Sequence, residues 1–96
     1  MIVRVSKITL ILPSRSLKEK RGILKSVIDR ISNRFRVSIA EVEGNDMPDI
    51  GVLGLAVVST KSRHAESVLN KSIMFLENSR PDVEVSSIQS ETVSGF

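Results

Sequence analysis

Eight basic side chains close together are the residues in this sequence best suited to binding chemistry. Residues 15–36 contain Arg15, Lys18, Lys20, Arg21, Lys25, Arg30, Arg34 and Arg36, and only two acids lie among them. Residues 1–36 as a whole carry a net charge of +8, while residues 37–96 carry −5. A dense basic segment of this kind binds phosphate groups, and nucleic acid presents these in closely spaced rows. We therefore predict that these eight residues contact nucleic acid.

The spacing of three of these cations places them in one row of a helix. Lys18, Arg21 and Lys25 follow at intervals of three and four residues, which brings side chains together on a helix surface. Like charges at this spacing repel by roughly 0.2–0.5 kcal/mol per pair. A helix face with no binding role would more often have acidic residues between its basic ones, so this row indicates a surface that binds an anionic partner. The alternative is a solvated helix face, which any basic protein can carry.

The element that must position these cations is a helix beginning at Leu17. Ser16 and Glu19 form a capping box, in which each side chain can bond the backbone N–H of the other residue. Apolar residues then recur at helical spacing and predict a buried stripe, which consists of Leu17, Leu24, Ile28, Ile31 and Phe35 and is widened by Ile23 and Val27. Gly22 costs this helix about 1 kcal/mol relative to Ala.

The remaining elements complete a recognisable order. Apolar runs predict strands at 2–12, 37–43, 52–59 and 82–90, with a loop at 44–51 and a second helix from Ser59–Ser62 to about Asn78. Strand–helix–strand–strand–helix–strand is the order of the ferredoxin-like split βαβ, an α+β fold with both helices on one face of a four-stranded antiparallel sheet. The first and third strands, which are the most apolar, should be central. We expect one domain over 1–96, frayed from about Glu91.

The first strand has apolar residues in two phases. Ile8 and Leu10 share one face, whereas Val3 and Val5 lie in the opposite phase. This pattern predicts either a bulge near Ser6–Lys7 or a strand buried on both sides.

Candidate catalytic and metal-binding residues are few. The chain has no Cys, and its one His, His64, has no second ligand of its kind, so we expect a surface residue there. Glu41 and Glu43 share one face of a regular strand, and edge-strand solubility explains them better than acid–base work. We therefore predict a protein that is not an enzyme and has no cofactor or metal. The absence of Cys, of a signal peptide and of an apolar span predicts a cytoplasmic location without membrane contact.

Other phosphate-binding and base-stacking devices are poorly supported. RNA-recognition motifs share the βαββαβ order but stack bases on sheet aromatics, whereas this chain has only three Phe and no Tyr or Trp. Acylphosphatases share it too, but "LPSRSLKEK" lacks the glycines of their anion loop. Ser14, Arg15 and Ser16 precede a helix N-terminus that could hold a phosphate, although the capping box uses some of its donors. Contact with structured RNA through its backbone is the better prediction.

The segments "LILPSRSLKEKRGILKSVIDRISNRFRVSIAEVE" and "LGLAVVSTKSRHAESVL" resemble the YlxP-like family of small bacterial proteins of unknown function. The most specific part is P-x-x-S-L-K-E-K-R, followed by "NRFRVSIAEV" and "LGLAVVS". The resemblance implies a ferredoxin-like fold, no catalytic activity, and genes often beside those for translation initiation and ribosome maturation. It carries over residues 16–21 and 33–35. Relatives often have Arg in place of Gly22, and an aromatic and a basic residue in place of Pro48 and Ile50, so the 44–51 loop should bind any partner differently here.

Two functions follow from these patterns. The first is a binding protein for structured RNA or ribosomal particles, in which the basic first helix contacts phosphate. The alternative is a homo-oligomeric protein-interaction or small-ligand module with no nucleic-acid role. In that case the edge strands 37–43 and 82–90 would pair across a two-fold axis as a homodimer, with Val83 and Val85 buried between the copies.

Overall fold

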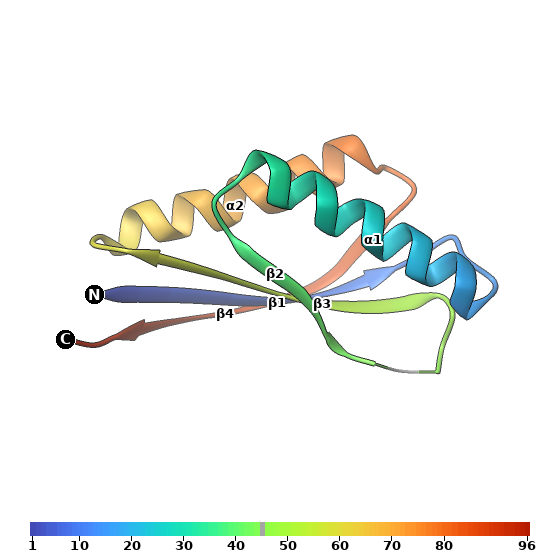
Figure 1. The fold of residues 1–96 in the computed structure, drawn as a ribbon, viewed down its shortest axis with the longest axis horizontal. Coiled ribbons are helices and arrows are strands. Elements are labelled where there is room, and N and C mark those ends of the chain that lie inside the picture. Colours follow the sequence, from blue (N-terminus) through green and yellow to red (C-terminus); the bar gives the residue numbers. More distant parts are fainter. Residues whose placement is uncertain (45) are drawn as a thin grey trace.

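The computed structural model describes residues 1–44 and 46–96, within which four strands and two helices follow in the predicted order (Figure 1). The strands are β1 (Ile2–Ile11), β2 (Ser38–Glu43), β3 (Ile50–Ser59) and β4 (Glu84–Ser94). The helices are α1 (Leu17–Arg34) and α2 (Ser62–Ser79). The start of α1 is the residue that the capping box predicts.

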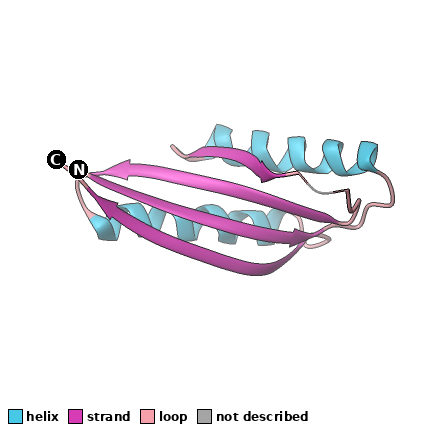
Figure 2. Cartoon of the chain, turned by 90° about the horizontal axis from the view of Figure 1, so that it is seen from below, coloured by secondary structure: helices cyan, strands magenta, loops and turns pink. Residues whose placement is uncertain are grey.

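The sheet has the topology that the element order predicts. Its strands lie in the order β2–β3–β1–β4, and neighbouring strands are antiparallel, so β1 and β3 are central. Both helices pack on one side of it, α2 mainly on β1 and β3, and α1 mainly on β2. Figure 2 looks onto the other side, with the strands in front of the helices. The predicted ferredoxin-like α+β fold is confirmed.

The hydrophobic core lies between the sheet and the helices. Ile8 and Leu10 of β1 and Leu53 and Leu55 of β3 are at most 2% exposed. They occupy alternate positions of paired strands, which point to the same side of a sheet. The helices complete the core with Leu24, Val27, Ile31, Ala65, Leu69, Ile73 and Leu76. This layer holds α1 in place and leaves its other flank free to carry charge.

The two apolar phases of β1 do not come from a bulge near Ser6–Lys7. All of β1 is described, and it pairs with β3 in one continuous register. Val3 and Val5 therefore face away from the helices. The irregular positions lie in the edge strands instead, around Val42 in β2 and between Val85 and Ser87 in β4.

The C-terminal segment is a correction to the expected frayed tail. β4 continues to Ser94, which pairs with Ile2, and the Met1 ammonium donates a hydrogen bond of 2.9 Å to the Gly95 oxygen. The two termini consequently lie side by side (Figure 1). The polar residues after Ser90 join the sheet because β1 is long enough to supply backbone partners for all of them.

Candidate nucleic-acid interface

The first helix is positioned by its cap and by one buried face. The Ser16 hydroxyl accepts a hydrogen bond from the Glu19 backbone N–H at 3.1 Å, as the capping box predicts. The buried residues of α1 are Lys20, Leu24, Val27 and Ile31, which follow at intervals of four, three and four. Leu17, predicted to be buried, is 40% exposed because it lies one turn earlier, at the very start of the helix.

Three of the predicted cations form an exposed row on α1, which we call the outer row: Lys18, Arg21 and Lys25. Taking 100° per residue, they fall on the flank of the helix opposite the one that faces α2. Lys25 is 81% exposed and lies 3.8 Å from the Asp29 carboxylate, one turn further along. An exposed i,i+4 pair of this kind contributes only about 0.3–0.5 kcal/mol. An anionic partner could displace Asp29 at little cost.

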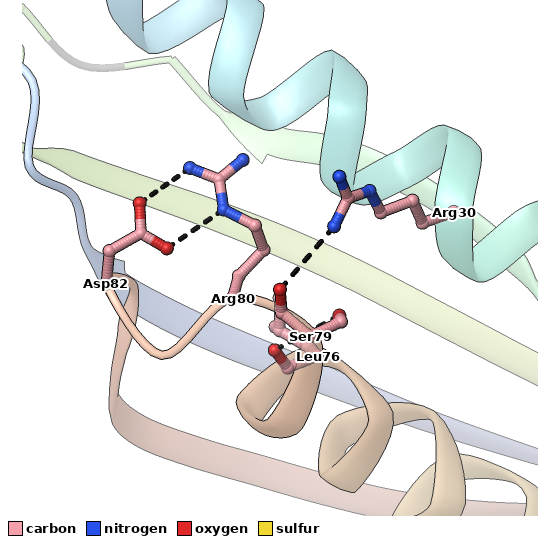
Figure 3. Close-up of polar contacts among 5 residues, drawn as sticks. All are labelled: Arg30, Leu76, Ser79, Arg80 and Asp82. Carbon is pink, nitrogen blue, oxygen red and sulfur yellow. Dashed lines mark hydrogen bonds and ion pairs between the residues drawn. The ribbon is translucent and has the colours of Figure 1, made fainter.

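Two further cations, which we call the inner pair, contact α2. The Arg30 guanidinium lies 3.5 Å from the Ser79 backbone oxygen, and both residues are labelled in Figure 3. The Arg34 guanidinium lies 4.9 Å from the centre of the Phe75 ring, within the range of a cation–π contact. Phe75 in turn packs edge-on against Phe35, with ring centres 5.7 Å apart. The basic residues of α1 therefore form two surfaces on opposite flanks.

Lys20 departs from the predicted interface because it is buried. Its side chain is 4% exposed, and its ammonium lies 3.3 Å from the Met47 backbone oxygen and 4.0 Å from the Glu41 carboxylate. It occupies the position one turn before Leu24 on the core face of α1. A side chain held there connects α1 to β2 and to the segment before β3, and it does not reach a phosphate outside the protein.

The residues on either side of α1 have different roles. Arg15 and Arg36 are exposed, as expected for contacts at the two ends of the helix. Ser14, considered above as part of a phosphate site, is 5% exposed and donates its hydroxyl to the Pro48 backbone oxygen. Because this donor is already used within the fold, the segment before α1 is a poor anion site.

An ion pair that sequence analysis missed follows α2. The Arg80 guanidinium donates two hydrogen bonds to the Asp82 carboxylate, at 2.9 and 2.7 Å (Figure 3). These bonds hold the pKa of the Asp82 carboxyl below its ordinary value and, in turn, raise the pKa of Arg80. The positive charge of Arg30 lowers the Asp82 pKa further. The only sequence signal was an Arg and an Asp around the Pro81 turn.

The two glutamates of β2 do not share a face. The irregularity at Val42 places Glu41 beside Leu53 and Glu43 beside Val52, which are adjacent residues of β3 and point to opposite sides. Glu41 accordingly lies near Lys20, whereas Glu43 accepts a hydrogen bond of 2.8 Å from Lys7 on the side away from the helices. The two carboxylates therefore cannot act as a pair.

The described parts of the chain contain neither a group of metal-binding side chains nor a helix that could span a membrane. Within residues 1–44 and 46–96, no group of three or more His, Cys, Asp or Glu is arranged to hold a metal ion, and His64 is exposed at the start of α2. Neither described helix is long and apolar enough to cross a membrane.

The edge strands lie where the homodimer prediction needs them, but two of its residues do not. β2 and β4 are the edges of the sheet. Val83 is 3% exposed within the core, and Val85 packs against the core. Neither valine is available to be buried between two copies.

Comparison with known proteins agrees with the sequence motifs. The sequence model of a family described as proteins of unknown function (DUF503) matches residues 3–90. The uncharacterised protein YlxP of Bacillus subtilis (strain 168) is 38% identical over 69 residues, covering 72% of this chain and 74% of that protein. The chain belongs to this YlxP-like family. The description of this family assigns no activity to its members.

Solved structures similar to this YlxP-like protein support its fold. A de novo designed protein with a ferredoxin fold, LFR1 1, has a TM-score of 0.55 at 16% identity, over 99% of this chain and 87% of that one. LarC2, the C-terminal domain of a cyclometallase involved in synthesis of the NPN cofactor of lactate racemase, has a TM-score of 0.51 at 10% identity, over 97% and 55%. At these identities the likeness concerns the fold alone.

Proposed function

We propose that this YlxP-like protein is a non-catalytic cytoplasmic protein that binds structured RNA, and ribosomal particles through it, with the outer row of α1. The observation that carries the proposal is the exposure of Lys18, Arg21 and Lys25 on a flank that packs against neither α2 nor the core. Over residues 18–25 the helix rises about 10.5 Å, a length along which a nucleic-acid duplex carries several phosphates.

The aromatic residues favour contact with the backbone of RNA over contact with bases. Base stacking needs an exposed ring face. Phe35 packs against Phe75, and Arg34 lies over the Phe75 ring. Phe96 is fully exposed, but it is a single ring beyond the end of β4 and not part of the sheet surface on which RNA-recognition motifs stack bases. Phosphate recognition by the outer row, extended by Arg15 and Arg36, is what remains, and it suits a double-stranded or folded RNA.

The test is co-sedimentation with isolated small and large ribosomal subunits across a salt series. Each phosphate contact contributes about 0.7–0.9 to the slope of log affinity against log salt. Replacing Lys18, Arg21 and Lys25 together by Ala should therefore reduce the slope by roughly 2–3 and abolish saturable binding near physiological salt.

A matched control removes the same charge from another surface. Lys61, Arg63 and Lys71 belong to α2 or its cap, and all three are exposed. Their triple Ala variant should bind as the wild-type protein does. Equal losses in both variants would mean that net charge alone drives binding, and an unchanged slope in the outer-row variant would refute the proposal.

A further inference from the structure

The side of the sheet away from the helices carries an apolar surface, which we call the open face. Direct partners in antiparallel strands point to the same side, so the open face contains Val3 and Val5 of β1, Val58 and Ala56 of β3, and Val93 of β4. Val58 is 67% exposed and Val93 is 50% exposed. Figure 2 shows the strands of this face unobstructed, with both helices behind them.

The centre of the open face is hollow. Gly54 pairs with Ala40 of β2, and Ala56 lies two positions further along β3, so this part of the floor is built from very small residues, while Lys7 of β1 lines the opposite side. Val42 leans over this floor, because a Cβ added at Gly54 would lie 2.6 Å from its Cγ1. The resulting cavity has a volume of about 560 Å³. A flat sheet would have no such hollow, and apolar side chains of another molecule could enter it.

The sequences of the central strands are those of strands covered on both sides. β1 supplies Ile8 and Leu10 to the core and Val3 and Val5 to the open face. β3 is an almost continuous apolar run from Ile50 to Val58, and such a run is consistent with a strand covered on both faces. Soluble monomers rarely expose a contiguous apolar patch beyond a few hundred Å². Among the described residues, the two helices cover one face of the sheet, and nothing covers the open face.

The charges on the open face argue against nucleic acid, and they restrict a second copy of this chain to orientations that pair Lys7 with an acid of the other copy. Among the described strand residues that point this way, Lys7 is the one cation, against Glu43, Glu84 and Glu91. This face would repel a polyanion, unlike the outer row of α1. A two-fold interface presents the same surface from both sides. Lys7 of each copy, already bonded to Glu43 at 2.8 Å, could then also meet Glu91 of the other copy.

The size of the open face is close to what a reversible dimer needs. Four strands about 4.8 Å apart, with central strands of ten residues at about 3.3 Å each, present a face on the order of 500 Å². Two such faces together bury on the order of 1,000 Å², near the lower limit of specific interfaces. We propose that two copies of this protein stack through their open faces as a weak, reversible homodimer. This surface is the face of the sheet and not the backbone edge of β2 or β4, and it is separate from α1.

The test measures dimerisation by sedimentation equilibrium, without RNA, from about 10 μM to about 1 mM, the range suited to a small interface. The wild-type protein should pass from monomer to dimer within it. Val58→Glu and Val93→Glu, measured separately, should each raise the dissociation constant tenfold or more, because a buried carboxylate without a partner is costly. Both side chains are at least half exposed, so the monomer should fold; circular dichroism checks this, and Val58→Lys serves as a second variant.

Ile88→Glu is the matched control for this interface. Ile88 is on β4 like Val93 and is equally exposed, at 51%, but it pairs with Ile8 and so lies on the helix side. Its variant should dimerise as the wild-type protein does. Equal weakening by Val93→Glu and Ile88→Glu would point to pairing along the edge of β4 and would overturn the proposal. A wild-type protein that remains monomeric at about 1 mM would also overturn the proposal, and the hollow would then be free for another ligand. Failure of the RNA test would leave this result unaffected.

Discussion

Replacing Lys20 would separate the two ways in which a buried lysine stabilises a fold. Its stem of four methylene groups packs inside the protein, and at about 0.8 kcal/mol per buried CH₂ this is worth up to about 3 kcal/mol. Its ammonium contacts the Met47 oxygen at 3.3 Å and Glu41 at 4.0 Å. Met47 is 52% exposed and the Glu41 side chain 38%, so water can replace these contacts, and their net contribution is about 1 kcal/mol. The stem should therefore contribute more than the charge.

We expect Lys20→Met, which keeps most of the stem, to lower the free energy of unfolding by about 1 kcal/mol, and Lys20→Ala by about 3 kcal/mol. For a chain of this size each kcal/mol corresponds to about 4–8 °C in melting temperature. Urea and thermal unfolding followed by circular dichroism measure both values. The salt slope of ribosome binding should not change in Lys20→Met, because this side chain is not part of the surface.

Two results would refute this reasoning about Lys20. Equal destabilisation by Lys20→Met and Lys20→Ala would mean that the ammonium contacts, and not the stem, hold the residue. A reduced salt slope in Lys20→Met, at unchanged stability, would place the ammonium on the RNA-binding surface and return Lys20 to the interface that the sequence predicts.

Two further predictions concern Gly22 within α1 and the ion pair that follows α2. Gly22 is exposed within α1, and a Cβ there would meet no atom within 4 Å. Gly22→Ala should therefore raise the free energy of unfolding, measured in urea, by about 1 kcal/mol. A lower free energy of unfolding in the variant would mean that the added methyl group clashes with a neighbouring group. Arg80 lowers the pKa of Asp82, so the pair stabilises the fold above the ordinary carboxyl pKa of about 3.9 and ceases to do so as the pH falls through the lowered value. Asp82→Asn should therefore be less stable than the wild-type protein at neutral pH, with a difference that disappears in acid; a difference that persists through about pH 2 would contradict the linkage.

Local signals in the sequence predicted the start of α1 correctly. They did not predict which residues of its first turns are buried. Ser16 and Glu19 locate the start of the helix because a cap involves only neighbouring residues. The buried face was harder to place. Leu17 and Lys20 lie on nearly the same side of the helix, and residue type favours Leu17 for the interior. Position decides otherwise, since Leu17 lies at the start of α1 while Lys20 lies one turn before Leu24 in the packed region.

The end of β4 and the irregularity of β2 depend on partners far away in the sequence. Residues 91–94 are mostly polar and have little strand pattern of their own, but they pair along the first residues of β1. In β2, the extra residue at Val42 separates Glu41 from Glu43, and it follows from the register with β3. Backbone pairing of this kind satisfies N–H and C=O groups whatever the side chains are, so composition alone does not reveal it.

The two apolar phases of β1 were visible in the sequence, and the structure decides between their two explanations. A bulge would have turned Val3 and Val5 toward the core, but the continuous register with β3 keeps them on the open face. Burial on both sides is the explanation that remains, and one chain supplies cover for only one side. The stacking of two copies proposed above would supply the second cover, with α1 and its outer row on the outside of each.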